Sequence, residues 1–239
     1  LSALLPSWVR EGGSEKLIER LRSTEVLEKI ARELEMKGIM NEASLEWSQI
    51  VLSYSVKFKE YEGRNIYEIS KELGTDPIRT ISKILIEDEG VSEMIIYAMS
   101  DVDVEKVISH PYVSIGSDGM IRRFGEGKPH PRNYGTFPRV ISEYVRKRKL
   151  LTLPEAIRKM TSLPARKLKL WDRGLIRPNA KADIVVFNYD TVSDTSTYQN
   201  PHSYPKGIKY VIVNGELVID EGEHTGKTPG RVLRSCNYR

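Results

Sequence analysis

The chain has 239 residues, of which 39% are hydrophobic and 29% are charged. This balance is typical of a packed globular protein and excludes an intrinsically disordered chain. No apolar run reaches the roughly 18 residues that a membrane-spanning helix requires, and no charged segment followed by an apolar one indicates a signal peptide. We therefore expect no membrane partner.

The net charge is +4, and the basic residues are mixed with acids except in one run, Arg-Lys-Arg-Lys at 146–149. Such a run could contact nucleic acid, but phosphate binding usually requires a wider basic face. Cations also suit the end of a solvated helix, which is the interpretation we favour. We expect no nucleic-acid partner. The single cysteine, Cys236, cannot form a disulfide within the chain, which favours a reducing, cytoplasmic location.

The first half of the chain predicts helices and one strand. Apolar residues recur at helical spacing over 14–37, where Gly38 is a typical helix end. A strand is predicted over 50–56 and a helix over 64–73. Asp76 and Pro77 then predict the start of the next helix, as an N-cap followed by proline at the first helical position.

Helices continue to about residue 170, with one apolar strand among them. Asp103 is predicted to open a short helix, and residues 112–117 are predicted to form a buried strand. A helix is predicted over 136–149. Thr152 and Glu155 form a capping-box pattern for a helix that runs to Met160.

From about residue 175 the pattern favours strands. Residues 183–187 and 210–213 are apolar and rich in β-branched side chains. Asn214 and Gly215 are the usual two-residue signal of a hairpin, which predicts a further strand over 217–219. The chain is therefore α/β, with a β-rich C-terminal part.

The chemically suggestive residues follow the predicted strand at 112–117. Asp118 comes directly after it, at the strand end where (β/α) folds keep their chemistry. Arg132 follows on the next loop. A carboxylate near a guanidinium suggests proton transfer on an anionic substrate, although an Asp-Gly pair in an ordinary turn and a surface arginine are the structural alternatives.

An ordered series of motifs gives the chain a family resemblance. The motifs are Ser-Ile-Gly-Ser-Asp-Gly at 114–119, Pro-His-Pro-Arg at 129–132, Gly-Thr-Phe-Pro-Arg-Val at 135–140, Lys-Met-Thr-Ser-Leu-Pro-Ala at 159–165, Ala-Asp-Ile-Val-Val-Phe at 182–187, Val-Asn-Gly at 213–215 and Thr-Gly-Lys-Thr-Pro-Gly-Arg-Val-Leu at 225–233. In this order they resemble the N-acyl-D-amino-acid deacylases (D-aminoacylases) of the amidohydrolase superfamily. The resemblance covers residues 110–234 and extends more loosely to residue 1.

The resemblance implies the C-terminal part of a (β/α)8 metal-dependent hydrolase barrel with a helical insertion, plus part of a small β-sandwich. Residues 1–45 would be mainly the helical insertion, residues 46–174 the last barrel strands and helices, and residues 175–239 the C-terminal part of the sandwich. The predicted strands at 50–56 and 112–117 would be the seventh and eighth of the barrel. The family is about twice this length, and its metal-binding His-x-His is absent from this chain. We therefore interpret the chain as a C-terminal half, from a truncated chain, a gene fragment or a split gene. An N-terminal half chain is then a possible partner.

The resemblance also assigns roles. Asp118 matches the general base that takes a proton from a metal-bound water, Arg132 matches the arginine that holds the substrate α-carboxylate, and His130 would line the same pocket. Zinc is the implied cofactor, because it lowers the pKa of bound water to about 7. Its ligands would precede residue 1, so none is assignable in this chain. The implied activity is hydrolysis of N-acyl-D-amino acids, for which the isolated chain would be inactive.

The remaining histidines, His110, His202 and His224, show no spacing that would place two imidazoles on one metal, and we interpret them as surface residues. Two alternatives to a deacylase remain: another cyclic amidohydrolase related to dihydroorotase or hydantoinase, and a non-catalytic scaffold subunit. The Pro-His-Pro-Arg and Gly-Thr-Phe-Pro-Arg motifs argue against the first.

Overall fold

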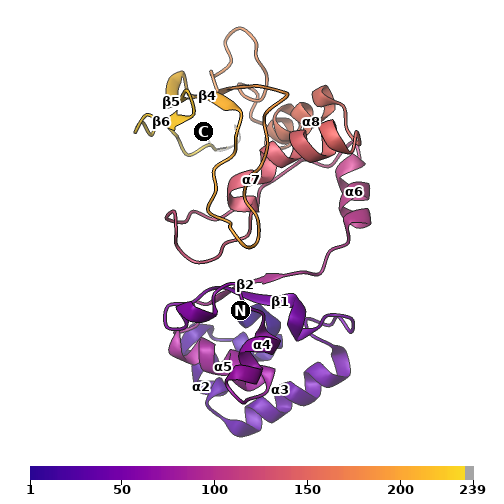
Figure 1. Ribbon diagram of the computed structural model, residues 1–239, viewed down its shortest axis with the longest axis vertical. Helices are drawn as coiled ribbons and strands as arrows, with labels where there is room; N and C mark the ends of the chain where they lie inside the picture. Colours follow the sequence, from indigo (N-terminus) through magenta and orange to yellow (C-terminus); the bar gives the residue numbers. More distant parts are fainter. Residues whose placement is uncertain (235–239) are drawn as a thin grey trace. The chain divides into compact units, whose positions relative to one another are not determined.

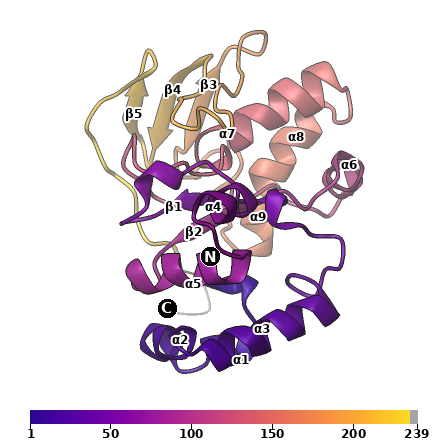
Figure 2. The same cartoon turned by 60° about the horizontal axis from the view of Figure 1, so that its bottom comes forward.

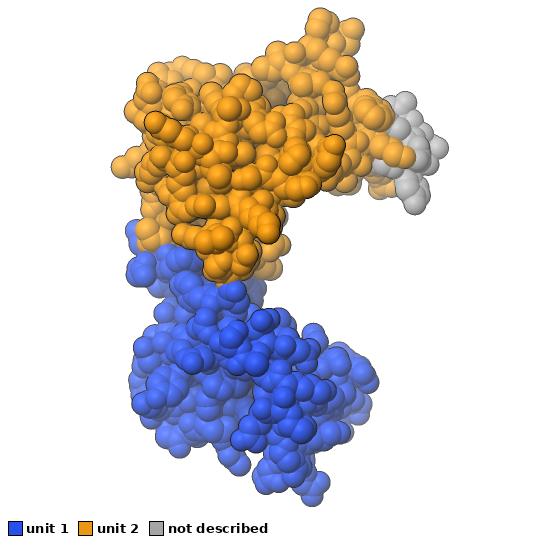
Figure 3. All heavy atoms as spheres, turned by 90° about the vertical axis from the view of Figure 1, so that its right-hand side faces the viewer, with its two compact units in different colours: residues 1–98, 122–130, 198–202 blue, residues 99–121, 131–197, 203–239 orange. Residues whose placement is uncertain are grey.

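The computed structural model describes residues 1–234, which gather into two compact units (Figure 3). The N-terminal unit contains residues 1–98, 122–130 and 198–202. The C-terminal unit contains residues 99–121, 131–197 and the described residues from 203 onward. The predicted domain boundaries near residues 45 and 174 stay predictions.

The N-terminal unit is mostly helical (Figure 1). Its elements are η1 (Ser2–Leu4), α1 (Ser7–Arg10), α2 (Gly13–Leu21), α3 (Thr24–Lys37), η2 (Trp47–Gln49), β1 (Ile50–Tyr54), η3 (Lys59–Tyr61), α4 (Ile66–Glu72), α5 (Pro77–Glu87) and β2 (Glu93–Ile96). The helices predicted over 14–37 are confirmed as α2 and α3. Gly38 ends α3 with a φ of 76°, and its N–H donates to the carbonyl of Leu34 at 2.8 Å.

Local capping explains where the helices of this unit begin. The carboxylate of Asp76 accepts hydrogen bonds from the backbone N–H groups of Ile78 and Arg79 at 3.0 and 2.9 Å, so the predicted start of α5 is confirmed. The helices α2, α3 and α5 then pack their apolar faces together (Figure 2). Side chains that are at most 1% exposed form the centre of this core: Leu4, Val9, Leu21, Ile30, Ile50, Leu52, Ile66, Ile69, Ile81, Ile84 and Leu85.

Of the two strands that were predicted for the barrel, a strand forms at the first position and none forms at the second. Residues 50–54 do form a strand, but β1 pairs antiparallel with β2, which the sequence did not predict. Residues 112–117 form no strand. A buried parallel strand requires neighbours along both edges, and within residues 1–234 no strand pairs with this segment. Its backbone accepts hydrogen bonds from side chains instead, and the described chain closes no barrel.

The C-terminal unit combines short helices with one sheet. Its elements are α6 (Asp101–Ser109), α7 (Arg132–Arg139), the π-helix η4 (Val140–Lys147), α8 (Leu153–Met160), α9 (Ser162–Lys167), β3 (Ile184–Phe187), β4 (Ile208–Val213), β5 (Glu216–Asp220) and β6 (Glu223–His224).

Two helix starts in this unit differ from the prediction. The helix predicted from Asp103 begins at Asp101, because the Ser100 hydroxyl accepts from the N–H of Asp103 at 3.1 Å and so caps it earlier. The helix predicted over 136–149 begins at Arg132 and becomes a π-helix after Pro138, which has no N–H for the regular ladder. Thr152 caps α8 through the N–H of Glu155, as half of the predicted capping box, while the Glu155 carboxylate binds Arg158.

The four strands form one antiparallel sheet in the order β3-β4-β5-β6 (Figures 1 and 2). The predicted hairpin is confirmed, since Asn214 and Gly215 connect β4 to β5 with φ of 50° and 86°. Most residues of β3 to β5 are apolar, yet none in these described strands is buried, and Val185 in β3 is 52% exposed. These strands form one sheet, and its place in a two-layer sandwich stays a prediction.

Candidate functional site

Asp118 and Arg132 meet in the C-terminal unit, although 13 residues separate them. An Oδ atom of Asp118 lies 2.8 Å from Nη2 of Arg132, which begins α7. The Asp118 side chain is 83% exposed and the Arg132 side chain 42% exposed. The sequence predicted these residues near one rim, and the structure brings them into an ion pair that is open to solvent.

Asp118 lies in a backbone segment without regular secondary structure. Asp118 has a φ of 49°, a left-handed conformation that aspartate adopts more readily than most residues. The carboxamide of Asn133 then binds the backbone of Met120 in both directions, accepting from its N–H at 3.2 Å and donating to its carbonyl at 3.1 Å. A Cβ on Gly119 would lie 3.2 Å from the Cα of Asn133, so the glycine permits this close approach. Asn133 therefore fixes the backbone two residues after Asp118, which lies beside Arg132.

His130, the third predicted site residue, belongs to the N-terminal unit. Its Nε2 lies 3.0 Å from the hydroxyl of Tyr198, and the Tyr198 ring in turn contacts Tyr97 with ring centroids 4.8 Å apart. The preceding loop is attached to β1, because the N–H of Lys128 donates to the carbonyl of Ser53 at 2.7 Å. His130 thus sits in an aromatic cluster at the end of the β1–β2 ribbon, and its role in substrate binding stays a prediction.

His202 is a half-buried structural residue and not the surface residue that the sequence suggested. Its Nδ1 accepts from the N–H of Gly125 at 3.1 Å, so the ring proton is on Nε2, which lies 3.0 Å from the carbonyl of Gly127. His224 is exposed, as predicted. His110 contributes its backbone carbonyl to Lys159. Cys236 lies outside the described residues.

Three residues with local roles were not predicted: Asn133, Tyr198 and Lys159. Their contacts join positions 13, 68 and 49 residues apart, which periodicity cannot reveal. Only Lys159 carries a local signal, because it shares the buried side of α8 with Ala156 at a spacing of three residues.

Among residues 1–234, no three His, Cys, Asp or Glu side chains come together as metal ligands would. A structural or catalytic zinc site takes at least three such ligands from the protein. The side chains that the structure describes therefore do not fit a zinc centre by themselves.

The basic run at 146–149 is held within the C-terminal unit. The guanidinium of Arg148 pairs with Glu143 and Asp101 at 2.8 and 3.3 Å, and also with Glu105. The hydrogen bonds that Arg148 donates to these carboxylates, Glu143 first, raise the pKa of Arg148. This arrangement favours the helix-end interpretation of the run over a phosphate-binding face.

The ion pairs of Glu143 predict how the free energy of unfolding depends on pH. Hydrogen bonds from Arg148 and then Lys147 lower the pKa of Glu143 below its ordinary value of 4.5. A lowered folded-state pKa means that the stabilisation is complete above pH 4.5 and is lost as the pH falls through the folded-state value. Glu143→Gln should therefore lower the free energy of unfolding at pH 7, and this difference from the parent should be smaller at pH 3. Urea unfolding at both pH values measures it. The control Glu223→Gln, an exposed glutamate on β6, should stay within about 0.5 kcal/mol of the parent at pH 7. An equal deficit for Glu143→Gln at both pH values would contradict the ion-pair explanation.

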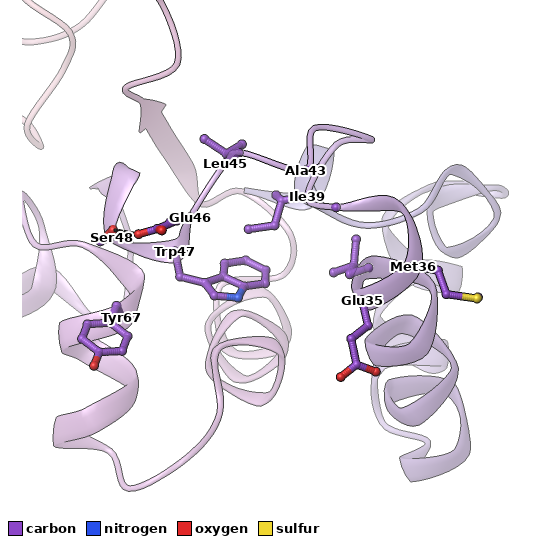
Figure 4. A pocket seen from close by; sticks show the side chains of 11 residues that line it. Glu35, Met36, Ile39, Ala43, Leu45, Glu46, Trp47, Ser48 and Tyr67 are labelled. Atoms are coloured by element: carbon purple, nitrogen blue, oxygen red, sulfur yellow. Dashed lines mark hydrogen bonds between the residues drawn. The ribbon is translucent and has the colours of Figure 1, made fainter.

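The N-terminal unit has an open groove of about 680 Å³ (Figure 4). Trp47 lies at its centre, with Ile39 and Leu45 from the segment after α3 and Tyr67 from α4 on its walls. None of Asp118, His130 and Arg132 lines it.

No helix within the described part of the chain combines the length and the apolar character that crossing a membrane requires.

Comparison with curated proteins finds N-acyl-D-amino-acid deacylases. The chain is 38% identical over 187 residues to the N-acyl-D-aspartate deacylase of Alcaligenes xylosoxydans xylosoxydans, and 37% and 36% identical to the N-acyl-D-glutamate deacylase and D-aminoacylase of the same organism. These matches cover 77–78% of this chain but 36% of each relative. The chain therefore spans about a third of the length of the relatives that it matches.

Solved structures show the same relationship. A D-aminoacylase studied for its binuclear metal centre superposes with a TM-score of 0.72 at 34% identity, over 81% of this chain and 39% of its own. An N-acyl-D-glutamate deacylase from Bordetella bronchiseptica, bound to zinc and a phosphonate mimic of the tetrahedral intermediate, superposes with a TM-score of 0.69 at 31% identity. That match covers 90% of this chain and 46% of the other.

A family model described as the amidohydrolase family matches residues 24–219, which is most of the chain. This match and the deacylase relatives confirm the resemblance that the ordered motifs indicated. The chain belongs to the amidohydrolase family.

Proposed function

We propose that this chain supplies the proton-transfer and carboxylate-binding residues of an enzyme that hydrolyses the amide bond of N-acyl-D-amino acids. The observation that carries the proposal is the approach of Asp118 to Arg132 at 2.8 Å, from two motifs that the deacylase resemblance had assigned to the site. One side chain can accept a proton and the other can hold an anion.

Asp118 is the general base of the proposal. Its carboxylate takes a proton from the attacking water and returns it to the leaving nitrogen, which converts the amide to a carboxylic acid and a free amine. Its exposed position gives a water molecule direct access to Oδ. The clamp that Asn133 places on Met120 keeps the base within reach of Arg132.

Arg132 is the substrate anchor. A guanidinium is planar and can donate two parallel hydrogen bonds to a carboxylate, which a lysine cannot do. In the structure Arg132 holds the carboxylate of Asp118. When the α-carboxylate of a substrate replaces Asp118 at this guanidinium, Asp118 is released to act on the water.

The relatives support the reaction class. Two curated relatives are named as deacylases of N-acyl-D-amino acids and the third as a D-aminoacylase, and this favours the deacylase over a cyclic amidohydrolase. Their identities to this chain are nearly equal, although their names give different side-chain preferences. The proposal is therefore limited to N-acyl-D-amino acids as a class.

We propose that the ligands of any catalytic metal come from polypeptide outside this chain. The solved relatives include a D-aminoacylase with a binuclear metal centre and a deacylase with bound zinc. Because the described side chains do not assemble such a centre, we derive no step through a metal. We place its ligands in polypeptide that corresponds to the part of the relatives beyond the matched region.

A fusion protein tests the function. The N-terminal part of the N-acyl-D-aspartate deacylase, up to the start of its match, is joined to residues 1–239, and release of free amine is measured from N-acetyl-D-amino acids. The fusion should hydrolyse these substrates, lose the activity when a chelator is added and regain it when zinc is added. Residues 1–239 alone should release no amine. A folded fusion that binds zinc but releases no amine would contradict the proposal.

Arg132→Lys separates substrate anchoring from chemistry in this fusion. The lysine keeps the charge but loses the two-point hydrogen bonding, so kcat/KM for the free acid should fall roughly 10-fold or more. For a substrate whose α-carboxylate is a methyl ester, kcat/KM should fall much less, because the ester has no carboxylate to accept the two hydrogen bonds of the guanidinium. The control Arg166→Lys, an exposed arginine on α9, should change neither substrate. Equal losses for acid and ester would show that Arg132 does not read a carboxylate.

A further inference from the structure

The segment that leads to Asp118 is held by cations instead of by neighbouring strands. Residues 110–113 follow α6 and run beside α8 (Figure 1). All four of their backbone carbonyls accept hydrogen bonds from the side chains of three basic residues, Arg158, Lys159 and Lys167. We call these three residues the cation cradle.

Lys159 is the centre of the cradle. Its side chain is fully buried, and its ammonium donates to the carbonyls of His110 and Val113, the latter at 3.1 Å. The backbone carbonyl of Lys159 also accepts from the N–H of Ile115 at 3.0 Å. A buried ammonium is costly unless its donors are satisfied. These bonds and the carboxylate of Glu155, 3.9 Å away, satisfy it and tie the segment to α8.

The two other cations complete the cradle from its exposed side. Arg158 donates to the carbonyl of Pro111, and Lys167 on α9 donates to the carbonyl of Tyr112 at 2.8 Å. Arg158 is itself held by two contacts of 2.8 Å to Glu155. The side chain of Ile115 packs against the apolar core of the same unit. The chain is thus fixed up to residue 115, three residues before Asp118.

The backbone after Asp118 is fixed as well, because Asn133 binds the backbone of Met120. Asp118 lies between these two attachments, in a segment without secondary structure. We propose that the cation cradle, with Lys159 at its centre, is a positioning device that sets the backbone ahead of Asp118 and so holds this carboxylate beside Arg132. The role of this positioning in catalysis rests on the proposed function, whereas the hydrogen bonds of the cradle are independent of it.

Amide hydrogen exchange on residues 1–239 tests the cradle without any need for activity. In Lys159→Met, peptides within 110–119 should exchange about 10-fold faster or more, because hydrogen bonds to charged groups are among the stronger ones. Peptides from β3 to β5 should keep the parental rate. The control Lys106→Met, an exposed lysine on α6, should leave both regions unchanged. Lys159→Arg retains donors at this position and should restore part of the protection.

Two outcomes would overturn the proposal: unchanged exchange over 110–119 in Lys159→Met, or equal acceleration throughout the C-terminal unit, which would indicate a role in folding alone. If Lys159→Met does not fold, Lys167→Met decides, because Lys167 is exposed and its loss leaves the core intact. Faster exchange confined to 110–119 then supports the cradle, and parental exchange refutes it.

The fusion protein adds a readout at Asp118. Lys159→Met should lower kcat about 10- to 100-fold while KM changes by less than about twofold, because a displaced base slows proton transfer more than substrate binding. If the fusion itself has no activity, the proposed function fails while the exchange result still decides whether the cradle fixes the segment.

Discussion

Asp118→Asn in the fusion protein should lower kcat roughly 10²- to 10⁴-fold, the usual contribution of general acid–base catalysis. The amide keeps the size and much of the hydrogen-bonding shape of the carboxylate but cannot take the proton from water. KM should change much less, since Arg132 remains to hold the substrate carboxylate. Steady-state hydrolysis of an N-acetyl-D-amino acid measures both constants.

The substitution should not unfold the protein, because the ion pair with Arg132 is exposed and pairs of this kind contribute about 0–1 kcal/mol. A parental thermal midpoint therefore accompanies the loss of turnover. Asp190→Asn, an exposed aspartate after β3, is the matched control and should leave kcat unchanged. Near-parental kcat in Asp118→Asn would make Asp118 a structural turn residue.

Asp88→Leu should destabilise the N-terminal unit by about 3–5 kcal/mol, which is a large share of the stability of a domain. Asp88 is 2% exposed and accepts four hydrogen bonds. The hydroxyls of Ser55 and Ser92 donate to Oδ2 at 2.6 Å each, and the backbone N–H groups of Val56 and Lys57 donate to Oδ1 at 3.2 and 2.8 Å. Leucine would leave the buried hydroxyls of Ser55 and Ser92 without this acceptor, at about 1–3 kcal/mol each before relaxation.

Asp88→Asn should cost less, about 1–3 kcal/mol, because its carboxamide oxygen still accepts while its NH₂ group faces donors. Urea unfolding followed by Trp8 and Trp47, both in this unit, reports the change. Glu87→Leu, the exposed neighbour on α5, should stay within about 0.5 kcal/mol of the parent. If Asp88→Leu were as mild as this control, the network would add little to stability.

The features that the sequence predicted correctly depend on neighbours along the chain. The cap at Asp76, the helix end at Gly38 and the hairpin turn at Asn214 are each decided by a few adjacent residues, and all three are confirmed. The strand predicted over 112–117 depends instead on partners elsewhere. An apolar, β-branched run is compatible with a buried strand, but without neighbouring strands its first two carbonyls, of Tyr112 and Val113, accept hydrogen bonds from Lys167 and Lys159.

In the candidate site, the residues with proposed chemical roles could be predicted from the sequence, whereas the residues that position them could not. Asp118 and Arg132 were selected from short motifs, and the structure places them in contact. The residues that hold them in place were not predictable, because Asn133 acts on Met120 and Lys159 acts on His110 through contacts that only the folded chain creates. His130 is held by Tyr198, which lies 68 residues further along the chain. Spacing in the sequence carries no information about such pairs.

The stereochemistry of hydrolysis by the fusion protein tests the central claim most directly. Paired N-acetyl-D- and N-acetyl-L-amino acids are supplied at equal concentration, with zinc present, and the free amine is measured with and without Asp118→Asn. We predict release from the D-enantiomer at least about 10-fold faster than from the L-enantiomer, and its loss in Asp118→Asn. Equal hydrolysis of both enantiomers, or D-selective hydrolysis that survives Asp118→Asn, would contradict the account of this chain as the part of a D-amino-acid deacylase that carries the base.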